Sequence, residues 1–148
     1  MTDKAKILVV DDQLAVAMMM VFLLARAGCQ AETALNADQA LHLARAEPFA
    51  LITIDIGMPD HDGFELFERL KEIPHLHATP VIFVTGQATT EAREQAFELG
   101  AADFIEKPFD AKDFISRILS HLDGKTRHEN SLRKHRSDTR LSPFNTCK

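Results

Sequence analysis

Short apolar runs alternate with longer amphipathic segments along most of this chain, and this alternation narrows the possible folds more than any other feature. The runs at 6–10, 50–54 and 81–84 are mostly apolar and rich in Val and Ile, as strands buried on both faces are. Weaker strands are expected at 30–34, near a sheet edge, and at 101–105. The segments between the strands space their apolar residues as one helical face does. Helices are expected at 14–27, 37–46, 63–73 and 90–99, and from a cap at Asp110 to about Leu122, where Gly124 ends the last one.

Five strands that alternate with five helices predict an α/β fold, a doubly wound parallel sheet with helices on both faces. The chain is long enough for one such domain, with 148 residues of which 45% are hydrophobic. No apolar run approaches the roughly 20 residues that cross a bilayer, and the start is too short for a signal-peptide core. Because Cys29 and Cys147 are the only cysteines, no disulfide framework is expected. We expect a reduced, cytoplasmic protein that does not contact a membrane.

Charge divides the chain into two parts. Residues 1–123 hold 10 Lys and Arg against 20 Asp and Glu, a net of −10, whereas residues 124–148 hold 7 against 2, a net of +5. The acidic body argues against direct nucleic-acid binding by this chain. We expect one domain over 1–123. The basic tail over 124–148 is expected to be partly disordered, to link to an output domain, or to bind an acidic partner.

Polar residues follow four of the expected strands at the point where each one ends. Asp11 and Asp12 follow the first strand, Asp55 the third, Thr85 the fourth and Lys107 the fifth. Parallel strands place all of these ends on one edge of the sheet, where ligands bind in open α/β folds. Taken singly, each residue has a plainer explanation, such as a helix cap, a turn or a solvated charge. Their coincidence at one edge predicts a single site.

Three carboxylates in one place repel one another unless a cation is present. Mg²⁺ suits such a cluster because it takes hard oxygen ligands, keeps several waters and favours phosphate-bearing partners. A metal ion beside an ammonium group suits phosphoryl transfer, in which catalysis consists mainly of positioning and charge neutralisation. Asp55 can then act as a carboxylate nucleophile and form an aspartyl phosphate.

These residues stand in four pieces that together resemble the response-regulator receiver domain of two-component signalling. The pieces are Val9-Val-Asp-Asp12, Asp55-Ile-Gly-Met-Pro-Asp-His-Asp-Gly63, Thr85-Gly86 and Lys107-Pro108, in the order and at the separations usual in that family. The resemblance covers about residues 4–123. It implies a flavodoxin-like (βα)5 fold with the strand order 2-1-3-4-5.

The resemblance also implies a role for each site residue. Asp12 and Asp55 would coordinate Mg²⁺ with Asp11 assisting, and the backbone carbonyl of Gly57 would supply a further oxygen. Asp55 would accept the phosphoryl group from a phosphohistidine on a histidine kinase or a histidine phosphotransfer protein. Lys107 would pair with a phosphoryl oxygen. The protein would then be a signalling phosphoacceptor rather than an enzyme.

A conformational switch follows from the same resemblance. Thr85 would hydrogen-bond the phosphoryl group, and the ring of Phe104 on the fifth strand would turn into the space left behind. A plainer explanation of Phe104 is a core residue. The surface that changes would comprise 90–99, 101–105 and the last helix. It would control binding to a downstream protein or to an output domain outside this chain, and phosphorylation would also allow a dimer.

Some positions depart from the common pattern of the family. Position 104 is Phe where many relatives have Tyr, so it offers no hydroxyl to a partner. Gln13 stands where an acidic residue is common. Gly57 and Gln87 lie beside the phosphoryl site at positions that vary and tune the lifetime of the aspartyl phosphate, and Gly57 is expected to leave the site open on one side. The Lys107–Pro108 bond is expected to be cis.

Two other functions are compatible with the sequence. A protein-binding pseudo-receiver would work without phosphorylation, although the complete set of polar residues argues against it. A Mg²⁺-dependent phosphohydrolase would share the aspartyl-phosphate chemistry. It would need a substrate-covering cap, for which the short connections leave no room.

Two further groups of residues have ordinary structural explanations. Met18, Met19 and Met20 are adjacent, so at most two of them can face the core, and packing is the expected role. His75 and His77 are expected to be solvated in a loop rather than to bind a metal.

Overall fold

A five-stranded parallel sheet forms the centre of the computed structural model, which describes residues 4–59 and 62–134, with side chains as far as residue 122. The strand order is β2-β1-β3-β4-β5, and each neighbouring pair is parallel. This is the flavodoxin-like order that the resemblance implied. The strands are β1 Lys6–Val10, β2 Gln30–Ala34, β3 Leu51–Ile54, β4 Val81–Thr85 and β5 Asp103–Glu106.

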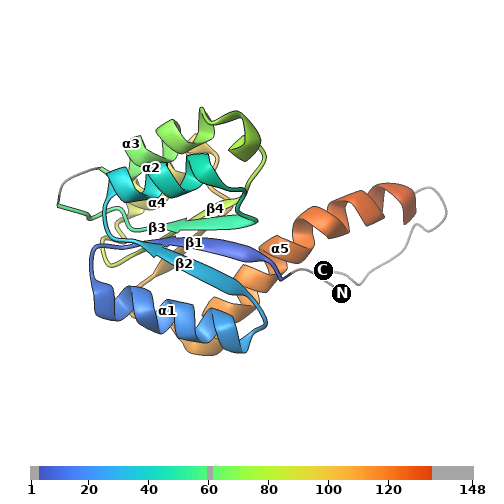
Figure 1. The fold of residues 1–148 in the computed structure, drawn as a ribbon, viewed down its shortest axis with the longest axis horizontal. Coiled ribbons are helices and arrows are strands. Elements are labelled where there is room, and N and C mark those ends of the chain that lie inside the picture. Colours follow the sequence, from blue (N-terminus) through green and yellow to red (C-terminus); the bar gives the residue numbers. More distant parts are fainter. Residues whose placement is uncertain (1–3, 60–61, 135–148) are drawn as a thin grey trace.

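Helices cover both faces of this sheet (Figure 1). Side chains of α1 and α5 pack on one face, and those of α2, α3 and α4 pack on the other. A short 3-10 helix, η1, follows α3 within the connection to β4. The helices are α1 Leu14–Arg26, α2 Ala37–Ala46, α3 Gly63–Lys71, η1 Pro74–Leu76, α4 Thr90–Leu99 and α5 Ala111–Lys134.

The central strands are buried on both faces because successive side chains point into two different cores. Leu8 and Val10 of β1 belong to the core that includes α2 and α3, whereas Ile7 and Val9 belong to the core that includes α1 and α5. This alternation explains why the central strands appear in the sequence as continuous apolar runs. The edge strand β2 keeps most of its side chains partly exposed, as its weaker pattern indicated.

The helix ends follow the predicted caps. Asn36 accepts a hydrogen bond from the backbone N–H of Gln39 at 2.8 Å, and Asp110 accepts one from the backbone N–H of Asp113 at 3.0 Å. Gly100 ends α4 with a φ of +105°, a left-handed conformation that glycine adopts without steric cost.

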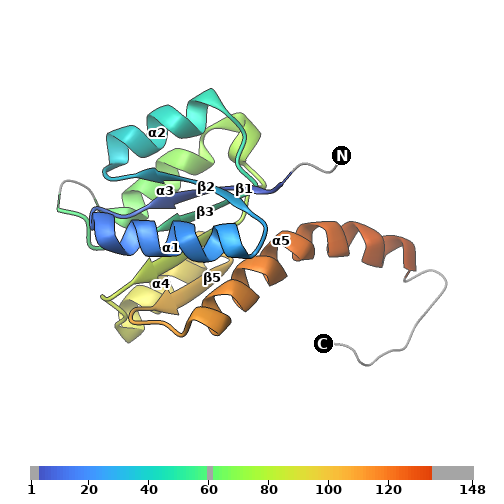
Figure 2. The same ribbon diagram turned by 60° about the horizontal axis from the view of Figure 1, so that its bottom comes forward.

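The last helix is longer than predicted. Because α5 runs to Lys134, the expectation that Gly124 ends it is wrong. A glycine inside a helix costs about 1 kcal/mol relative to Ala, and good helix formers such as Lys125, Arg127 and Glu129 surround it. Residues 124–134 of the expected tail are therefore helical, and α5 projects away from the sheet (Figure 2). The rest of that tail, 135–148, lies outside the described residues.

The connection between α3 and β4 is more ordered than a simple loop. Lys71 ends α3 and donates hydrogen bonds to the carbonyls of Leu76, His77 and Thr79. His75 is exposed, as predicted, and its Nε2 atom lies 2.8 Å from the carbonyl oxygen of Ala44. Among the described residues, no helix is both long and apolar enough to span a membrane.

Candidate functional site

Three charged groups from separate strand ends meet at the carboxyl edge of the sheet. Lys107 Nζ lies 2.6 Å from Asp11 Oδ2 and 2.9 Å from Asp55 Oδ2. Asp11 and Asp55 are 1% and 7% exposed. The three residues are far apart in the sequence, and the parallel sheet brings them together as their strand-end positions predicted.

Backbone amides fix the direction of both buried carboxylates. Asp11 and Asp55 each continue the hydrogen bonding of the sheet by one residue, past β1 and β3. Asp55 Oδ1 accepts a hydrogen bond from the N–H of Gly57 at 3.0 Å, and Asp11 Oδ1 accepts one from the N–H of Gln13 at 2.9 Å. In each carboxylate, one oxygen is therefore bound by a following amide and the other by Lys107.

Lys107 remains a cation in this site. Burial alone would lower the pKa of the Lys107 ammonium group, but the hydrogen bonds and charges of Asp11 and Asp55 outweigh burial and raise its pKa above the ordinary value. The Lys107–Pro108 peptide bond is cis, as expected. The site thus contains a permanent positive charge between two carboxylates.

Asp12 adds a third carboxylate that is partly exposed. One oxygen from each of Asp11, Asp12 and Asp55 lies within 4.8 Å of the others. Within 4–59 and 62–122, no other group of acidic, His or Cys side chains gathers in this way. Three hard oxygen donors at an open sheet edge fit Mg²⁺, which binds carboxylates directly and keeps several waters.

The side chain of Gln87 lies directly beside Gly57. A Cβ atom at position 57 would lie 2.4 Å from Gln87 Nε2. Gln87 also donates its backbone N–H to Thr85 Oγ1 at 3.1 Å. The loops after β3 and β4 therefore touch, and both line one hollow. Spacing in the sequence could not show this contact, because it is made by side chains of separate loops.

Gly63 allows α3 to start close to the end of β3. A Cβ atom at position 63 would lie 2.7 Å from the carbonyl oxygen of Asp55 and 2.7 Å from the Cα atom of Ile56. Because both are backbone atoms, they cannot move aside without displacing the site. The preceding Asp62 accepts a hydrogen bond from the N–H of Phe64 at 3.0 Å and caps α3. The sequence indicated a turn here but not this close approach.

Thr85 and Phe104, the residues predicted to switch, are both buried. Thr85 ends β4 and is 0% exposed. Phe104 lies in the core beside α4 and is 1% exposed. The guanidinium carbon of Arg93 lies 4.8 Å from the Phe104 ring centroid, a cation–π contact that the sequence did not indicate. In this structure Phe104 packs as a core residue.

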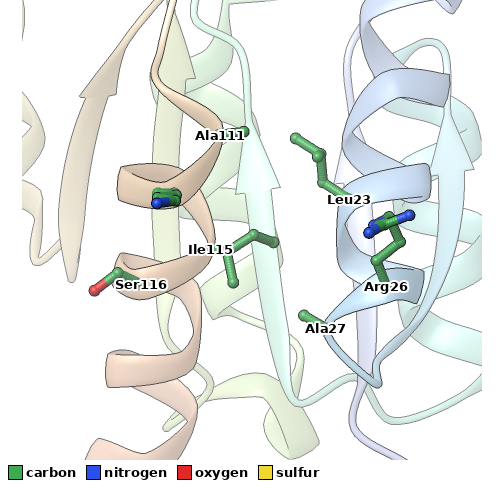
Figure 3. Close-up of a pocket in the computed structure, with 7 residues that line it drawn as sticks. Leu23, Arg26, Ala27, Ala111, Ile115 and Ser116 are labelled. Atoms are coloured by element: carbon green, nitrogen blue, oxygen red, sulfur yellow. The ribbon is translucent and has the colours of Figure 1, made fainter.

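A separate apolar hollow lies between α1 and α5 (Figure 3). Its volume is about 350 Å³, and no carboxylate lines it. Leu23 and Ile115 reach into it from the two helices, and Arg26 and Lys112 supply its charged groups. The hollow is therefore not part of the acidic site.

Comparisons with known sequences agree with this geometry. The family model for the response regulator receiver domain matches residues 7–119. The transcriptional activator protein IrlR of Burkholderia pseudomallei is 36% identical over 129 residues, which cover 86% of this chain and 55% of IrlR. The transcriptional regulatory protein ResD of Bacillus subtilis is 33% identical over 121 residues, or 82% of this chain and 49% of ResD. The chain thus spans about half the length of these curated relatives.

Solved structures show the same architecture. A response regulator receiver domain protein (CheY-like) from Methanospirillum hungatei JF-1 superposes with a TM-score of 0.80 at 30% identity. The match covers 85% of this chain and 99% of that one. The family model spans the strand ends that carry the carboxylates, Thr85 and Lys107. The chain therefore belongs to the response regulator receiver domain family of two-component signalling.

Proposed function

We propose that this receiver accepts a phosphoryl group on Asp55 from a phosphohistidine, and that this modification is its signal. One observation carries the proposal. The ammonium group of Lys107 contacts two buried carboxylates at once, 2.9 Å from Asp55 Oδ2 and 2.6 Å from Asp11 Oδ2. A fixed cation beside buried acids, with the carboxylate of Asp12 nearby, forms a site suited to a metal ion and a phosphoryl group.

Asp55 is the nucleophile in this proposal. Its carboxylate oxygen forms a bond to phosphorus, the bond from phosphorus to the donor nitrogen breaks, and the imidazole nitrogen recovers the electron pair. The N–H of Gly57 holds the Asp55 carboxylate in place, and Lys107 offsets negative charge on the phosphoryl oxygens. Mg²⁺, which Asp11, Asp12, Asp55 and the Gly57 carbonyl would hold, supplies further charge neutralisation.

The proposed donors are a histidine kinase or a histidine phosphotransfer protein. After transfer, Thr85 bonds a phosphoryl oxygen and Phe104 moves, which changes the surface formed by α4, β5 and α5. That surface binds a downstream protein, an output domain or a second phosphorylated copy. IrlR and ResD are named as a transcriptional activator and a transcriptional regulatory protein, and the match to this chain covers only 55% and 49% of their lengths. Their extra length supports an output domain reached through the basic segment that follows the receiver domain of 1–123.

The chain itself would act as a signalling phosphoacceptor in the cytoplasm. Its chemistry would be limited to its own phosphorylation and dephosphorylation. The net charge of −10 over 1–123 supports partners other than nucleic acids.

Phosphorylation by a small donor tests the proposal. The chain is incubated with Mg²⁺ and acetyl phosphate, and its intact mass is measured. We expect one phosphoryl adduct, stable in acid and labile in base, that Asp55→Ala abolishes. Asp62→Asn is the matched control, because Asp62 is a nearby carboxylate that caps α3 and Asn also caps helices well. An adduct that survives Asp55→Ala, or a wild-type chain that never gains one, overturns the assignment.

Two other measurements address the remaining alternatives. A pseudo-receiver would bind no Mg²⁺, so calorimetric titration should show binding in the wild type and loss of binding in Asp12→Ala. A phosphohydrolase would turn over many times on a panel of phosphoesters, and we expect no such turnover.

A further inference from the structure

The helix α4 is the least deeply packed of the three helices on its face of the sheet. Ala96 is its one buried residue, whereas α2 has four buried residues and α3 has five. Ala92 and Leu99 add partly buried contacts with the same core. Elements with few buried apolar contacts open at a low cost in free energy. Contacts at the surface of α4 therefore matter more for holding it on the sheet than they do for α2 and α3.

Arg93 makes one such contact with the neighbouring strand. The residue is exposed, and its guanidinium carbon lies 4.8 Å from the centroid of the Phe104 ring on β5. Within the part of the chain whose side chains are described, the Arg93 guanidinium has no hydrogen bond or ion pair that competes with the ring. The ring itself is 1% exposed. Arg93 thus covers a buried aromatic ring from α4.

Phe104 connects this contact to the acidic site. It lies opposite Phe83 in the pairing of β5 with β4, and the Phe83 ring packs against Phe64 with 5.2 Å between the centroids. Three residues after Phe104, the backbone N–H of Lys107 donates to the carbonyl of Thr85 at 2.9 Å. A displacement at the end of β4 therefore reaches Phe104 through hydrogen-bonded strands, and Phe104 passes it to α4 through Arg93.

We propose that Arg93 is a latch on Phe104. Its guanidinium group stabilises the arrangement of α4 and β5 seen here, and the contact must break when Phe104 moves. This inference rests on the proposed function, in which phosphorylation moves Phe104. Arg93 is a positioning residue, because it touches no group of the acidic site and acts on the response through the ring.

The strength of the contact defines what the latch can do. A cation–π contact at an exposed site changes an equilibrium constant by about two- to fivefold. The latch is weaker than the charge-assisted contacts that a phosphoryl group offers to Thr85 and Lys107, so it yields to phosphorylation. It sets the fraction of molecules in which Phe104 has already moved. The apparent affinity for a phosphoryl analogue follows this fraction, so loss of the latch should tighten binding by the same factor.

Binding of beryllofluoride, a phosphoryl analogue, to the full chain with Mg²⁺ tests the latch by isothermal titration calorimetry. Arg93→Ala should bind beryllofluoride about two- to fivefold more tightly than the wild type. Arg93→Lys keeps a cation over the ring, and its affinity should lie between the two. The direction of the change is informative, because loss of a positive charge by itself should weaken the binding of an anion.

Two controls separate the latch from charge and from packing. Arg69→Ala removes the same charge from an exposed position in the last turn of α3 and should not tighten binding. Phe104→Leu keeps an apolar core residue without a ring, so Arg93→Ala should have no effect in that background. Far-UV circular dichroism checks that all variants are folded. Binding by Arg93→Ala that is no tighter than that of the wild type, or an equal gain in the Phe104→Leu background, overturns the latch.

Amide hydrogen exchange without beryllofluoride tests the latch independently of the acidic site. The amides of 90–99 should exchange about two- to fivefold faster in Arg93→Ala than in the wild type, whereas those of α2 should not change. Equal exchange of 90–99 in the two chains also overturns the latch. A wild type that binds no beryllofluoride would instead overturn the proposed function, and faster exchange in Arg93→Ala would then still support the contact as a latch.

Discussion

The strand β1 has a lysine with two carboxylates at each of its ends, and the two clusters are built differently. At its start, Lys6 Nζ lies 2.5 Å from Glu47 Oε1 and 3.9 Å from Glu32 Oε1. At its end, Asp11 joins Asp55 and Lys107 at 2.6 and 2.9 Å. Distance alone does not separate the two clusters.

Burial and rigidity separate them. The side chains of Lys6, Glu47 and Glu32 are 29%, 30% and 40% exposed, so water screens their attraction. The side chains of the Lys107 cluster are 2% to 15% exposed, and backbone amides hold its short aspartates. Only the second cluster has a third carboxylate within metal-binding distance among the described residues. The Lys107 cluster is therefore the candidate metal-binding site, because its aspartates are buried, are held by backbone amides and have a third carboxylate beside them.

Replacement of the lysine in each cluster should give the largest difference in folding stability between the two clusters. Lys107→Met leaves two buried carboxylates without their cation, and we expect it to lower the free energy of unfolding by about 2–3 kcal/mol at neutral pH without Mg²⁺. Added Mg²⁺ should recover part of this loss. Lys6→Met should unfold close to the wild type. Urea titration followed by far-UV circular dichroism measures both, since the chain has no Trp or Tyr. Equal losses in the two variants would break the comparison.

The backbone beneath the acidic cluster should also be intolerant of change. Gly63→Ala places a Cβ atom 2.7 Å from the backbone of Asp55, and we expect a loss of about 1–3 kcal/mol in stability together with weaker Mg²⁺ binding. Gly86→Ala is the control at the same edge, because no atom lies within 4 Å of its Cβ position. Urea titration and calorimetry test both variants, and a stable Gly63→Ala that binds Mg²⁺ normally would contradict the close approach.

Alkaline pH should reduce the stabilisation that Lys107 provides, and this effect should be smaller than those of the substitutions above. The pKa of Lys107 is higher in the folded chain than its ordinary 10.5, so its stabilisation is complete below pH 10.5 and is lost as the pH rises through the folded value. The stability difference between the wild type and Lys107→Met should therefore shrink above pH 10.5. Unfolding midpoints of both chains between about pH 9 and 12 measure it. If the stability difference instead grew with pH, the pKa of Lys107 would not be raised in the folded chain.

Salt should have the smallest effect. Raising NaCl from about 0.1 to about 1 M shortens the Debye length from about 10 to about 3 Å. Any residual difference between Lys6→Met and the wild type should then vanish, while the difference for Lys107→Met should persist. Melting curves at the two salt concentrations test this. If the stability difference for Lys107→Met also disappeared at high salt, the Lys107 cluster would be exposed to solvent rather than buried.

The acidic site was predictable because a parallel sheet maps strand ends onto one edge. Asp11, Asp55, Thr85 and Lys107 each lie at the end of an expected strand, so their meeting needed only the strand assignments. Helix caps such as Asn36 were equally local signals. Features that follow from strand assignments or from local motifs could therefore be predicted from the sequence.

The features that the sequence did not predict depend on interactions beyond a single residue or local motif. Gly124 lies inside α5 because one glycine is a small penalty within a long run of helix-forming residues. The contact of Gln87 with Gly57 joins separate loops through a flexible side chain. Methionine side chains usually pack in a core, but Met18 and Met19 are exposed. They are exposed because α1 offers the core only one of its faces.

The two charged ends of β1 also set the alignment of the sheet. β1 pairs with β3 from Ile7 opposite Leu51 to Val10 opposite Ile54. A shift of one residue would either bring Lys6 into the fully buried place of Ile7 or move the buried Asp11 away from Lys107, and an unpaired buried charge is strongly destabilising. The same shift would exchange the two hydrophobic cores, because side chains alternate with a period of two. Charges that frame a five-residue strand thus select one register for the whole sheet, so the acidic residues of the site also specify the fold.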